Sequence, residues 1–412
     1  MAIFNYLKYI RPRMLSMLVL GFASGFPYAL TGPTLQAWYA STGIDIKTIG
    51  ALSLIGLPYL LKPIWAPIMD RYVPPFLGRR RGWVLIAQVL LVLTIAWMAL
   101  LNPIGNPEAL PLVALFVAFL SASQDISLDA YRTDILDPEE RGLGAAVWTA
   151  GWRCAPWFSG GIVLVIAEYV GWQWCYLLMA AVMSTAVITT ILSPEPSNVL
   201  PPKTMTKAVI EPFMEFFSRP YAILLLLFII LYKFGDAFAL SLSTTFYLRV
   251  VGLSLVEVGL ITKSVAVIAT FIGVFIGGFA MLRLKLWRSL LIFGILQALS
   301  NLMYLWLALA GKDYSLVSSA IFIEYLTGGM GTAVFVAYLM SLCDKRFTAF
   351  QFALFSVFSS LGRVLVGPFA AYVVEHSSWA MFFIDSVFLS IPGLLLLVWL
   401  RKRVNFDDVK IS

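Results

Sequence analysis

Apolar runs separated by short polar segments extend over almost the whole chain. A transmembrane helix requires about 20 consecutive, mostly apolar residues, and twelve runs of sufficient length can be placed. The predicted spans are 14–40, 48–69, 83–101, 110–133, 142–168, 172–193, 221–248, 255–281, 286–310, 315–342, 347–375 and 379–400. The pattern predicts an all-α integral membrane protein with 12 transmembrane helices, surrounded by the lipid bilayer.

Composition and charge agree with this class. Hydrophobic residues make up 60% of the chain and charged residues 12%, with a mean hydropathy of +0.88, whereas soluble domains are about 45–50% apolar and about 25% charged. The net charge of +7 does not indicate nucleic-acid binding, because the basic residues follow the loops. With a cytoplasmic N-terminus, 21 Lys and Arg residues lie on the cytoplasmic side, three lie on the opposite side and five lie within spans. This excess predicts that both termini are cytoplasmic.

The two halves of the chain resemble each other across a polar linker. GFPYALTGPT at 25–34 aligns with GDAFALSLST at 235–244, and GIDIKTIG at 43–50 aligns with GLSLVEVG at 252–259. Matches at nearly constant spacing indicate a six-plus-six duplication, the arrangement of major facilitator transporters. We predict two pseudo-symmetric six-helix halves, residues 1–193 and 220–412. The cytoplasmic linker between them is residues 194–219.

Polar residues inside the fourth predicted span are the first candidates for function. Asp125 and Asp129 are four residues apart and therefore share one helical face, and Gln124 precedes them. A carboxylate at this depth costs about 2.5–3.5 kcal/mol on insertion scales, so two on one face require partners or a polar cavity. They could pair with Arg132 and neighbouring helices, or they could form a substrate or proton site. We favour the second interpretation for Asp125.

The repeat separates shared charges from asymmetric ones, which are better candidates for function. The asymmetric buried charges are Lys62, Asp125, Asp129, Lys233, Asp236, Lys263 and Glu324. Lys233 and Asp236 are three apart and could also pair along their own helix. Arg153 and Arg363 repeat at a spacing of 210 residues and could neutralise buried acids or bind an anionic substrate.

Proton coupling would have to use carboxylates. The chain has one histidine, His376, so a relay of several histidines is excluded. A buried carboxylate exchanges its proton as a neighbouring cation comes and goes. The candidates are Asp125 and Glu324, followed by Asp129 and Asp236. The proton is the expected coupling ion, and no cofactor is predicted.

A membrane-embedded enzyme is the alternative class. The sequence contains no Walker A sequence, zinc motif or nucleophile elbow. GGMGT at 328–332 lacks the Lys-Ser/Thr ending and is typical of close helix packing. We therefore predict a transporter rather than an enzyme.

Several stretches resemble a known family. MDRYVPPFLGRRRGW at 69–83 resembles the Asp-Arg and Arg-Arg loop signature of the major facilitator superfamily, and DPEERG at 137–142 resembles its Pro-x-x-Arg-Gly loop. The more specific match is carried by GFASGFPYALTGPTLQAWY, SASQDISLDAYRTDIL, LYKFGDAFALSLSTTF and GGMGTAVFVAYLMSLC. These look like the AmpG-type muropeptide permeases of Gram-negative bacteria, and the resemblance runs from near the N-terminus to about Trp399.

The resemblance implies a proton-driven importer in the bacterial inner (cytoplasmic) membrane. Its substrates would be N-acetylglucosaminyl-1,6-anhydro-N-acetylmuramyl compounds, with or without peptide, whose uptake feeds cell-wall recycling and β-lactamase induction. By family analogy Asp70, Arg71 and Arg80 belong to a cytoplasmic charge latch, although the same charges also serve as an orientation signal. Some relatives are longer, with extra helices, whereas this chain has room for twelve.

A muropeptide is large, amphipathic and anionic, and the buried polar residues suit it. The cations suited to its carboxylates are Lys62, Arg153, Lys233, Lys263 and Arg363. Gln124, Asp125 and Trp152 would suit its hydroxyl, N-acetyl and sugar groups, although Trp148 and Trp152 are also typical of core packing. The same features would suit another anionic sugar, peptide or organic acid, so a major facilitator symporter for such a solute is the alternative. A monomer is expected.

Overall fold

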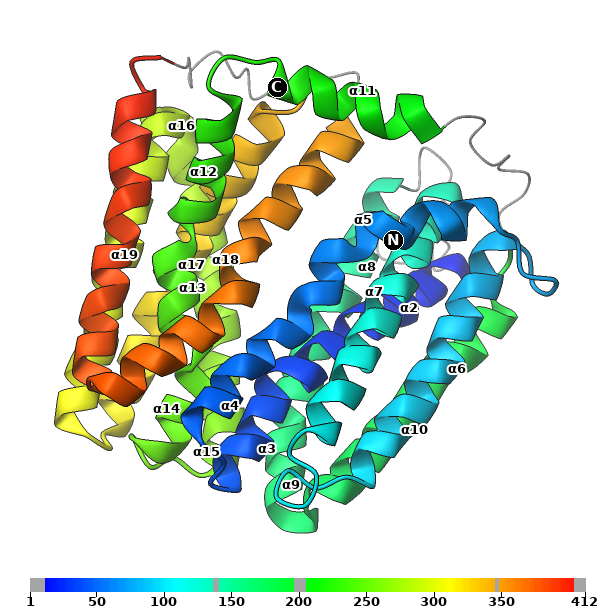
Figure 1. Cartoon of the computed structure of the whole chain (residues 1–412), viewed down its shortest axis with the longest axis horizontal. Helices are drawn as coiled ribbons and strands as arrows, with labels where there is room; N and C mark the ends of the chain where they lie inside the picture. Colours follow the sequence, from blue (N-terminus) through cyan, green and yellow to red (C-terminus); the bar gives the residue numbers. More distant parts are fainter. Residues whose placement is uncertain (1–11, 136–140, 196–204, 345–347, 404–412) are drawn as a thin grey trace, which may run out of the picture. The chain divides into compact units, whose positions relative to one another are not determined.

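The computed structural model describes residues 12–135, 141–195, 205–344 and 348–403. Within these ranges, twelve helical segments are long and apolar enough to cross a membrane (Figure 1), which confirms the predicted number. Each overlaps one predicted span. They are Arg13–Ser41, Ile46–Ala66, Arg79–Ala99, Ala109–Arg132, Val147–Val170, Trp172–Leu192, Ala222–Arg249, Leu255–Met281, Arg283–Ala310, Tyr314–Ser341, Gln351–His376 and Trp379–Leu400.

The chain forms two compact units. Unit 1 comprises residues 1–44 and 55–203, and unit 2 comprises residues 45–54 and 204–412. The first part of the second span therefore belongs to unit 2.

Unit 1 is built from long helices interrupted by short irregular turns. Its helices are α2 (Pro12–Ala29), η1 (Leu30–Thr34), α3 (Leu35–Ser41), α5 (Leu57–Arg71), α6 (Arg79–Ala99), α7 (Ala109–Ile135), α8 (Arg141–Trp157), η3 (Phe158–Ile162), α9 (Val163–Val170) and α10 (Trp172–Leu192). The helices α2 and α8 pack closely because glycines line their contact. A Cβ at Gly21 or Gly151 would overlap the backbone of the facing helix, and such close approach is typical of membrane helix pairs.

Unit 2 contains the remaining helices. They are α4 (Ile46–Ala51), α11 (Met205–Phe217), α12 (Ala222–Tyr232), α13 (Phe234–Ser241), α14 (Ser243–Arg249), α15 (Leu255–Glu257), η4 (Val258–Thr262), α16 (Lys263–Ala310), α17 (Tyr314–Ser341), α18 (Thr348–His376) and α19 (Trp379–Leu400). The helix α16 carries two spans, which are separated at Lys285, where φ is 60°. The short 3-10 turn η2 (Leu52–Gly56) joins α4 to α5.

The helix α4 packs against α18 through small residues. A Cβ at Gly50 would lie 2.5 Å from that of Ala371 and 2.6 Å from the carbonyl oxygen of Gly367. Nearby, the Ser53 hydroxyl donates a hydrogen bond of 2.8 Å to the Val364 carbonyl. These contacts with α18 are the reason why residues 45–54 belong to unit 2.

Local geometry supports the duplication read from the sequence. Gly43 and Gly252, which align in the repeat, both have positive φ, at 80° and 73°; this conformation favours glycine. Two residues further on, Asp45 and Ser254 both cap the next helix by accepting a backbone hydrogen bond. The turn before the second span of each half is therefore built in the same way.

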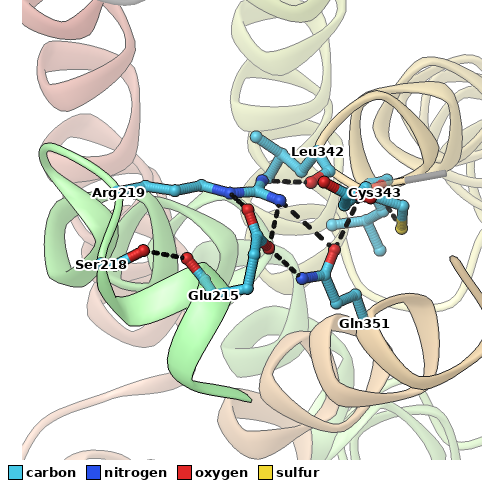
Figure 2. Close-up of polar contacts among 8 residues, drawn as sticks. Glu215, Ser218, Arg219, Leu342, Cys343 and Gln351 are labelled. Atoms are coloured by element: carbon cyan, nitrogen blue, oxygen red, sulfur yellow. Dashed lines mark hydrogen bonds and ion pairs between the residues drawn. The ribbon is translucent and has the colours of Figure 1, made fainter. Parts of the chain in front are cut away.

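The amphipathic helix α11 lies within the predicted linker and is fastened to unit 2 (Figure 1). Glu215 binds Arg219 through two hydrogen bonds of 2.9 and 2.6 Å, and Gln351 donates to Glu215 at 2.5 Å (Figure 2). Arg219 also donates to the Leu342 carbonyl at 2.5 Å. We call Glu215, Arg219 and Gln351 the α11 clasp, and it ties α11 to the ends of α17 and α18.

Candidate functional site

Asp125 is held against the first span in unit 1. It lies on α7, and the Ser24 hydroxyl on α2 donates a hydrogen bond of 2.6 Å to its Oδ1. Two charged side chains act on this carboxylate electrostatically: the cation Lys62 on α5 and the acid Asp129 on α7. The arrangement gives a carboxylate at membrane depth one hydroxyl donor and one cation.

Polar atoms without partners surround Asp125. The Gln124 amide nitrogen donates to the Ala23 carbonyl at 2.9 Å. Among the described residues, the Gln124 amide oxygen, the Tyr59 hydroxyl and the Ser121 hydroxyl are buried without a hydrogen-bond partner. A buried polar atom left unpaired costs about 1–3 kcal/mol, so these atoms are placed to bind water or polar groups of a solute.

Asp129 differs from Asp125 in its surroundings. Its side chain is 54% exposed, and it forms an ion pair of 3.4 Å with Arg132. The guanidinium of Arg132 lies over the Trp148 ring at 5.1 Å. The ion pair of Asp129 with Arg132, one of the two interpretations of this acid, is therefore present, whereas a role of Asp129 in proton coupling stays a prediction.

The two tryptophans of α8 have different environments. Trp148 is 4% exposed and packs in the core, whereas Trp152 is 40% exposed. They do not form a joint sugar-stacking surface, because Trp148 is packed in a buried cluster and only Trp152 is accessible. Arg153 lies on the exposed part of α8 as well.

Glu324 is the corresponding buried acid of unit 2. It lies on α17 and is 1% exposed. Its Oε2 lies 2.5 Å from the Ser300 hydroxyl on α16, whereas its Oε1 has no hydrogen-bond partner among the described residues. Asp236 and Lys233 are the charged groups that act on it electrostatically.

Lys233 lies where the seventh span breaks. Helix α12 ends at Tyr232 and α13 begins at Phe234, with Lys233 at φ −103° and ψ 2° between them. Within the described part of the chain, its hydrogen bonds go to Gln297 at 3.1 Å and Thr332 at 3.4 Å. The ion pair with Asp236 considered from the sequence is not formed, because the Lys233 ammonium group is directed to these side chains on α16 and α17 instead.

The other two predicted cations of unit 2 have different surroundings. Lys263 is partly buried, and its side chain makes no hydrogen bond or ion pair with any described residue. Arg363 on α18 is exposed and acts electrostatically on Lys233. The structure thus brings Arg363 toward the cluster of Lys233, Asp236 and Glu324, whereas no charged group acts on Lys263.

A polar stripe on α16 was missed by sequence reasoning. It consists of Gln297, Ser300, Asn301 and Tyr304, all buried. Gln297 accepts from Lys233, Ser300 contacts Glu324, and Tyr304 shares a hydrogen bond of 2.8 Å with Tyr247. The signal was available, since the spacing i, i+3, i+4, i+7 places four polar residues on one face of an otherwise apolar helix.

Only part of the predicted cytoplasmic charge latch lies within the described residues. Arg80 on α6 forms an ion pair of 2.9 Å with Asp134, and Glu195 accepts the backbone N–H groups of Arg80 and Arg81 at 3.0 and 3.2 Å. The sequence analysis did not select Asp134 or Glu195. The side chains of the predicted partners Asp70 and Arg71, and most of the loop 137–142, lie outside the described residues.

Both units therefore share one chemical motif. Each places a carboxylate beside a serine hydroxyl and within electrostatic reach of a lysine: Asp125 with Ser24 and Lys62, and Glu324 with Ser300 and Lys233. Such a carboxylate can take up or release a proton when its cation moves. In the described part of the chain, no group of His, Cys, Asp and Glu side chains is arranged to hold a metal ion.

Comparison with known proteins gives a consistent result. Residues 17–365 match the family model described as Major Facilitator Superfamily. The anhydromuropeptide permease of Escherichia coli strain K12 is 49% identical over 408 residues, which cover 98% of this chain and 83% of that protein. An uncharacterised protein of Haemophilus influenzae is 36% identical over 401 residues, which cover 94% of each chain.

Solved structures show the same fold at low sequence identity. The crystal structure of the nucleoside transporter NupG superimposes with a TM-score of 0.72 over 95% of this chain and all of that chain, at 14% identity.

Proposed function

The chain belongs to the Major Facilitator Superfamily, as a multi-pass inner-membrane transporter of the AmpG-type permease family and not an enzyme, and we propose that it imports anhydromuropeptides by proton-coupled alternating access. The substrates are N-acetylglucosaminyl-1,6-anhydro-N-acetylmuramyl compounds with or without peptide. They move from periplasm to cytoplasm for cell-wall recycling. The observation that carries the proposal is the 49% identity to the E. coli anhydromuropeptide permease over 98% of the chain.

Proton coupling is supported by two carboxylates inside the spans, of which Glu324 is buried and Asp125 is partly buried. Asp125 and Glu324 each lie at membrane depth beside a serine and a lysine. A buried carboxylate is costly in a membrane unless it is neutralised by a proton or a cation. Alternation between these two states, as helices rearrange, would link proton movement to the change of access.

Binding of an anionic sugar is supported by the polar atoms left unpaired in each unit. In unit 1 these include the Gln124 amide oxygen and the Tyr59 hydroxyl. In unit 2, Lys263 and Lys233 provide positive charge, and the Lys263 side chain makes no hydrogen bond or ion pair with any described residue. Carboxylates of the muropeptide would bind the lysines, and hydroxyl and N-acetyl groups would bind the neutral side chains.

The direction of transport follows from the proposed coupling. In a symporter, protons that enter from the periplasm down their gradient would carry substrate into the cytoplasm. The excess of 21 basic residues over three supports cytoplasmic termini.

Uptake by purified protein in proteoliposomes tests the proposal. Labelled anhydromuropeptide should accumulate above its external concentration only when an inward proton gradient is imposed. Equilibration without accumulation would retain transport and reject coupling. Absence of uptake by folded protein would reject the substrate class and favour a symporter for another anionic sugar, peptide or organic acid, which competition by these solutes would identify.

A further inference from the structure

Ser300 has one hydroxyl hydrogen and two short acceptors. Its Oγ lies 2.5 Å from Oε2 of Glu324 and 2.7 Å from the carbonyl oxygen of Gln297 on its own helix. A serine hydroxyl has a single hydrogen to donate. Both contacts can therefore be hydrogen bonds at the same time only if Glu324 supplies a second hydrogen.

The hydrogen count defines two arrangements. When Glu324 is ionised, the Ser300 hydroxyl must donate to the carboxylate and loses its bond to the Gln297 carbonyl. When Glu324 is protonated, the acid donates its proton to the Ser300 oxygen, and Ser300 donates to Gln297. The neighbouring Thr327 hydroxyl, whose oxygen is 3.2 Å from that of Ser300, also lies 2.9 Å from the Ile323 carbonyl and 3.0 Å from the Glu324 carbonyl. Thr327 can therefore donate its own hydrogen, and Ser300 does not have to donate to it.

We propose that Ser300 is a positioning residue whose hydroxyl switches between Glu324 and the Gln297 carbonyl as Glu324 loses and gains a proton. Glu324 is the group that gains and loses the proton, and the serine hydrogen rotates without leaving its oxygen. Because Ser300 lies on α16 and Glu324 on α17, each protonation state has its own pattern of hydrogen bonds between these helices. This role of Ser300 rests on the proposed proton coupling through Glu324 and identifies the hydroxyl group that responds to it.

Other groups near Glu324 belong to several helices. The titratable groups that interact with it electrostatically are Lys233, Asp236, Tyr247, Tyr304 and Tyr325. Tyr247 and Tyr304 are hydrogen-bonded to each other at 2.8 Å, and Lys233 donates to Gln297 and Thr332. Ser300 thus supplies the hydroxyl in contact with the carboxylate, and a Ser300 variant leaves all five titratable groups in place.

The test is the pH dependence of anhydromuropeptide exchange in proteoliposomes with equal pH on both sides. A hydrogen bond to a charged group is stronger than one to a neutral group, so removing the hydroxyl disfavours the ionised form. In Ser300→Ala, the pH at half-maximal exchange should shift upward by about one unit. Ser300→Thr, which keeps a hydroxyl, should restore the wild-type midpoint.

A matched control is available on α19. Ser386 is also fully buried and donates to the carbonyl of the residue three positions earlier, Phe383, at 2.7 Å. Ser386→Ala removes the same group without touching a carboxylate and should leave the midpoint unchanged. If Ser300→Ala does not reach the membrane, Ser300→Cys, a weaker donor, should give a smaller upward shift.

A second readout separates this inference from the proposed function. The carboxylic acid C=O band of protonated Glu324, identified by its loss in Glu324→Gln, can be titrated by infrared spectroscopy without substrate. Its midpoint should shift in Ser300→Ala as the exchange midpoint does. An unshifted band in that variant would overturn the inference, even if the wild type transports. A shifted band in a protein that transports no muropeptide would reject the proposed function and support the role of Ser300.

Discussion

The Ser24 hydroxyl on the first span donates a hydrogen bond of 2.6 Å to Asp125 on the fourth span, 101 residues later in the chain. In unit 2, Thr332, which aligns with Asp125 in the repeat, binds Lys233 instead, at 3.4 Å. Lys233 itself aligns with Ala23, the neighbour of Ser24. The duplicated helix contact therefore carries an acid in unit 1 and a base in unit 2, so the charged groups at this contact differ between the two halves.

Replacing Asp125 should uncouple substrate transport from the proton gradient. Asp125→Asn keeps the shape and can still accept from Ser24, but it cannot exchange a proton. We expect at least a tenfold loss of gradient-driven accumulation, measured as labelled substrate in proteoliposomes. The control is Asp129→Asn, whose exposed carboxylate is paired with Arg132 and whose loss should leave most of the accumulation. Equal loss in both variants would contradict a special role for Asp125.

The lysine at the break of the seventh span should also be required. Lys233→Ala removes the cation near Asp236 and Glu324 and leaves the Gln297 amide without its donor. Accumulation should be abolished while the protein still reaches the membrane, as checked by membrane fractionation. Lys233→Arg keeps the charge and should retain part of the activity. Full activity of the alanine variant would remove Lys233 from the mechanism.

Trp152 offers a test of sugar binding. Its exposed ring can stack on a sugar face, whereas Trp148 is buried beneath Arg132. Trp152→Ala should weaken binding of a sugar-containing muropeptide several-fold more than binding of the free peptide, measured by competition for uptake. An equal effect on both ligands would reduce Trp152 to a packing residue.

The contact between α2 and α8 should be sensitive to a single methyl group. Gly21→Ala places a Cβ against the Trp148 backbone, which has little freedom to move, and overpacking of this kind costs about 1–3 kcal/mol. The melting temperature of the detergent-solubilised protein should fall by several degrees. Gly278→Ala is the control, because no atom lies within 4 Å of its Cβ position; a comparable fall there would contradict the packing argument.

The α11 clasp should respond to acid. Hydrogen bonds from Arg219, and a further one from Gln351, hold the pKa of Glu215 below its ordinary value of 4.5. A group with a lowered folded-state pKa stabilises the structure above its ordinary pKa, and this contribution is lost as the pH falls through the lowered value. We therefore expect faster hydrogen exchange in residues 205–217 at pH values below 4.5 than at neutral pH, after correction for intrinsic rates.

Glu215→Gln should produce the same loosening at neutral pH. The matched variant Glu211→Gln changes an exposed acid on the same helix and should leave exchange unchanged. Protection of α11 that is equal in both variants and at all pH values would show that Phe216 and other apolar contacts alone hold the helix.

The twelve spans and the duplication can be read from the amino-acid pattern alone. A bilayer demands about 20 apolar residues per helix, so each span is visible in one dimension. The turn residues Gly43 and Gly252 and the caps Asp45 and Ser254 act within a few residues of themselves, so the repeat in sequence is also a repeat in local geometry.

Which polar groups meet depends on how the helices pack in three dimensions. Spacing along a helix gives the depth of a residue and its face, but the rotation of that face is set by packing against other helices. Asp134 became the partner of Arg80, and Ser300 that of Glu324, through such packing. At Lys233, packing likewise directs the ammonium group to Gln297 and Thr332 on other helices, and not to Asp236 on its own helix.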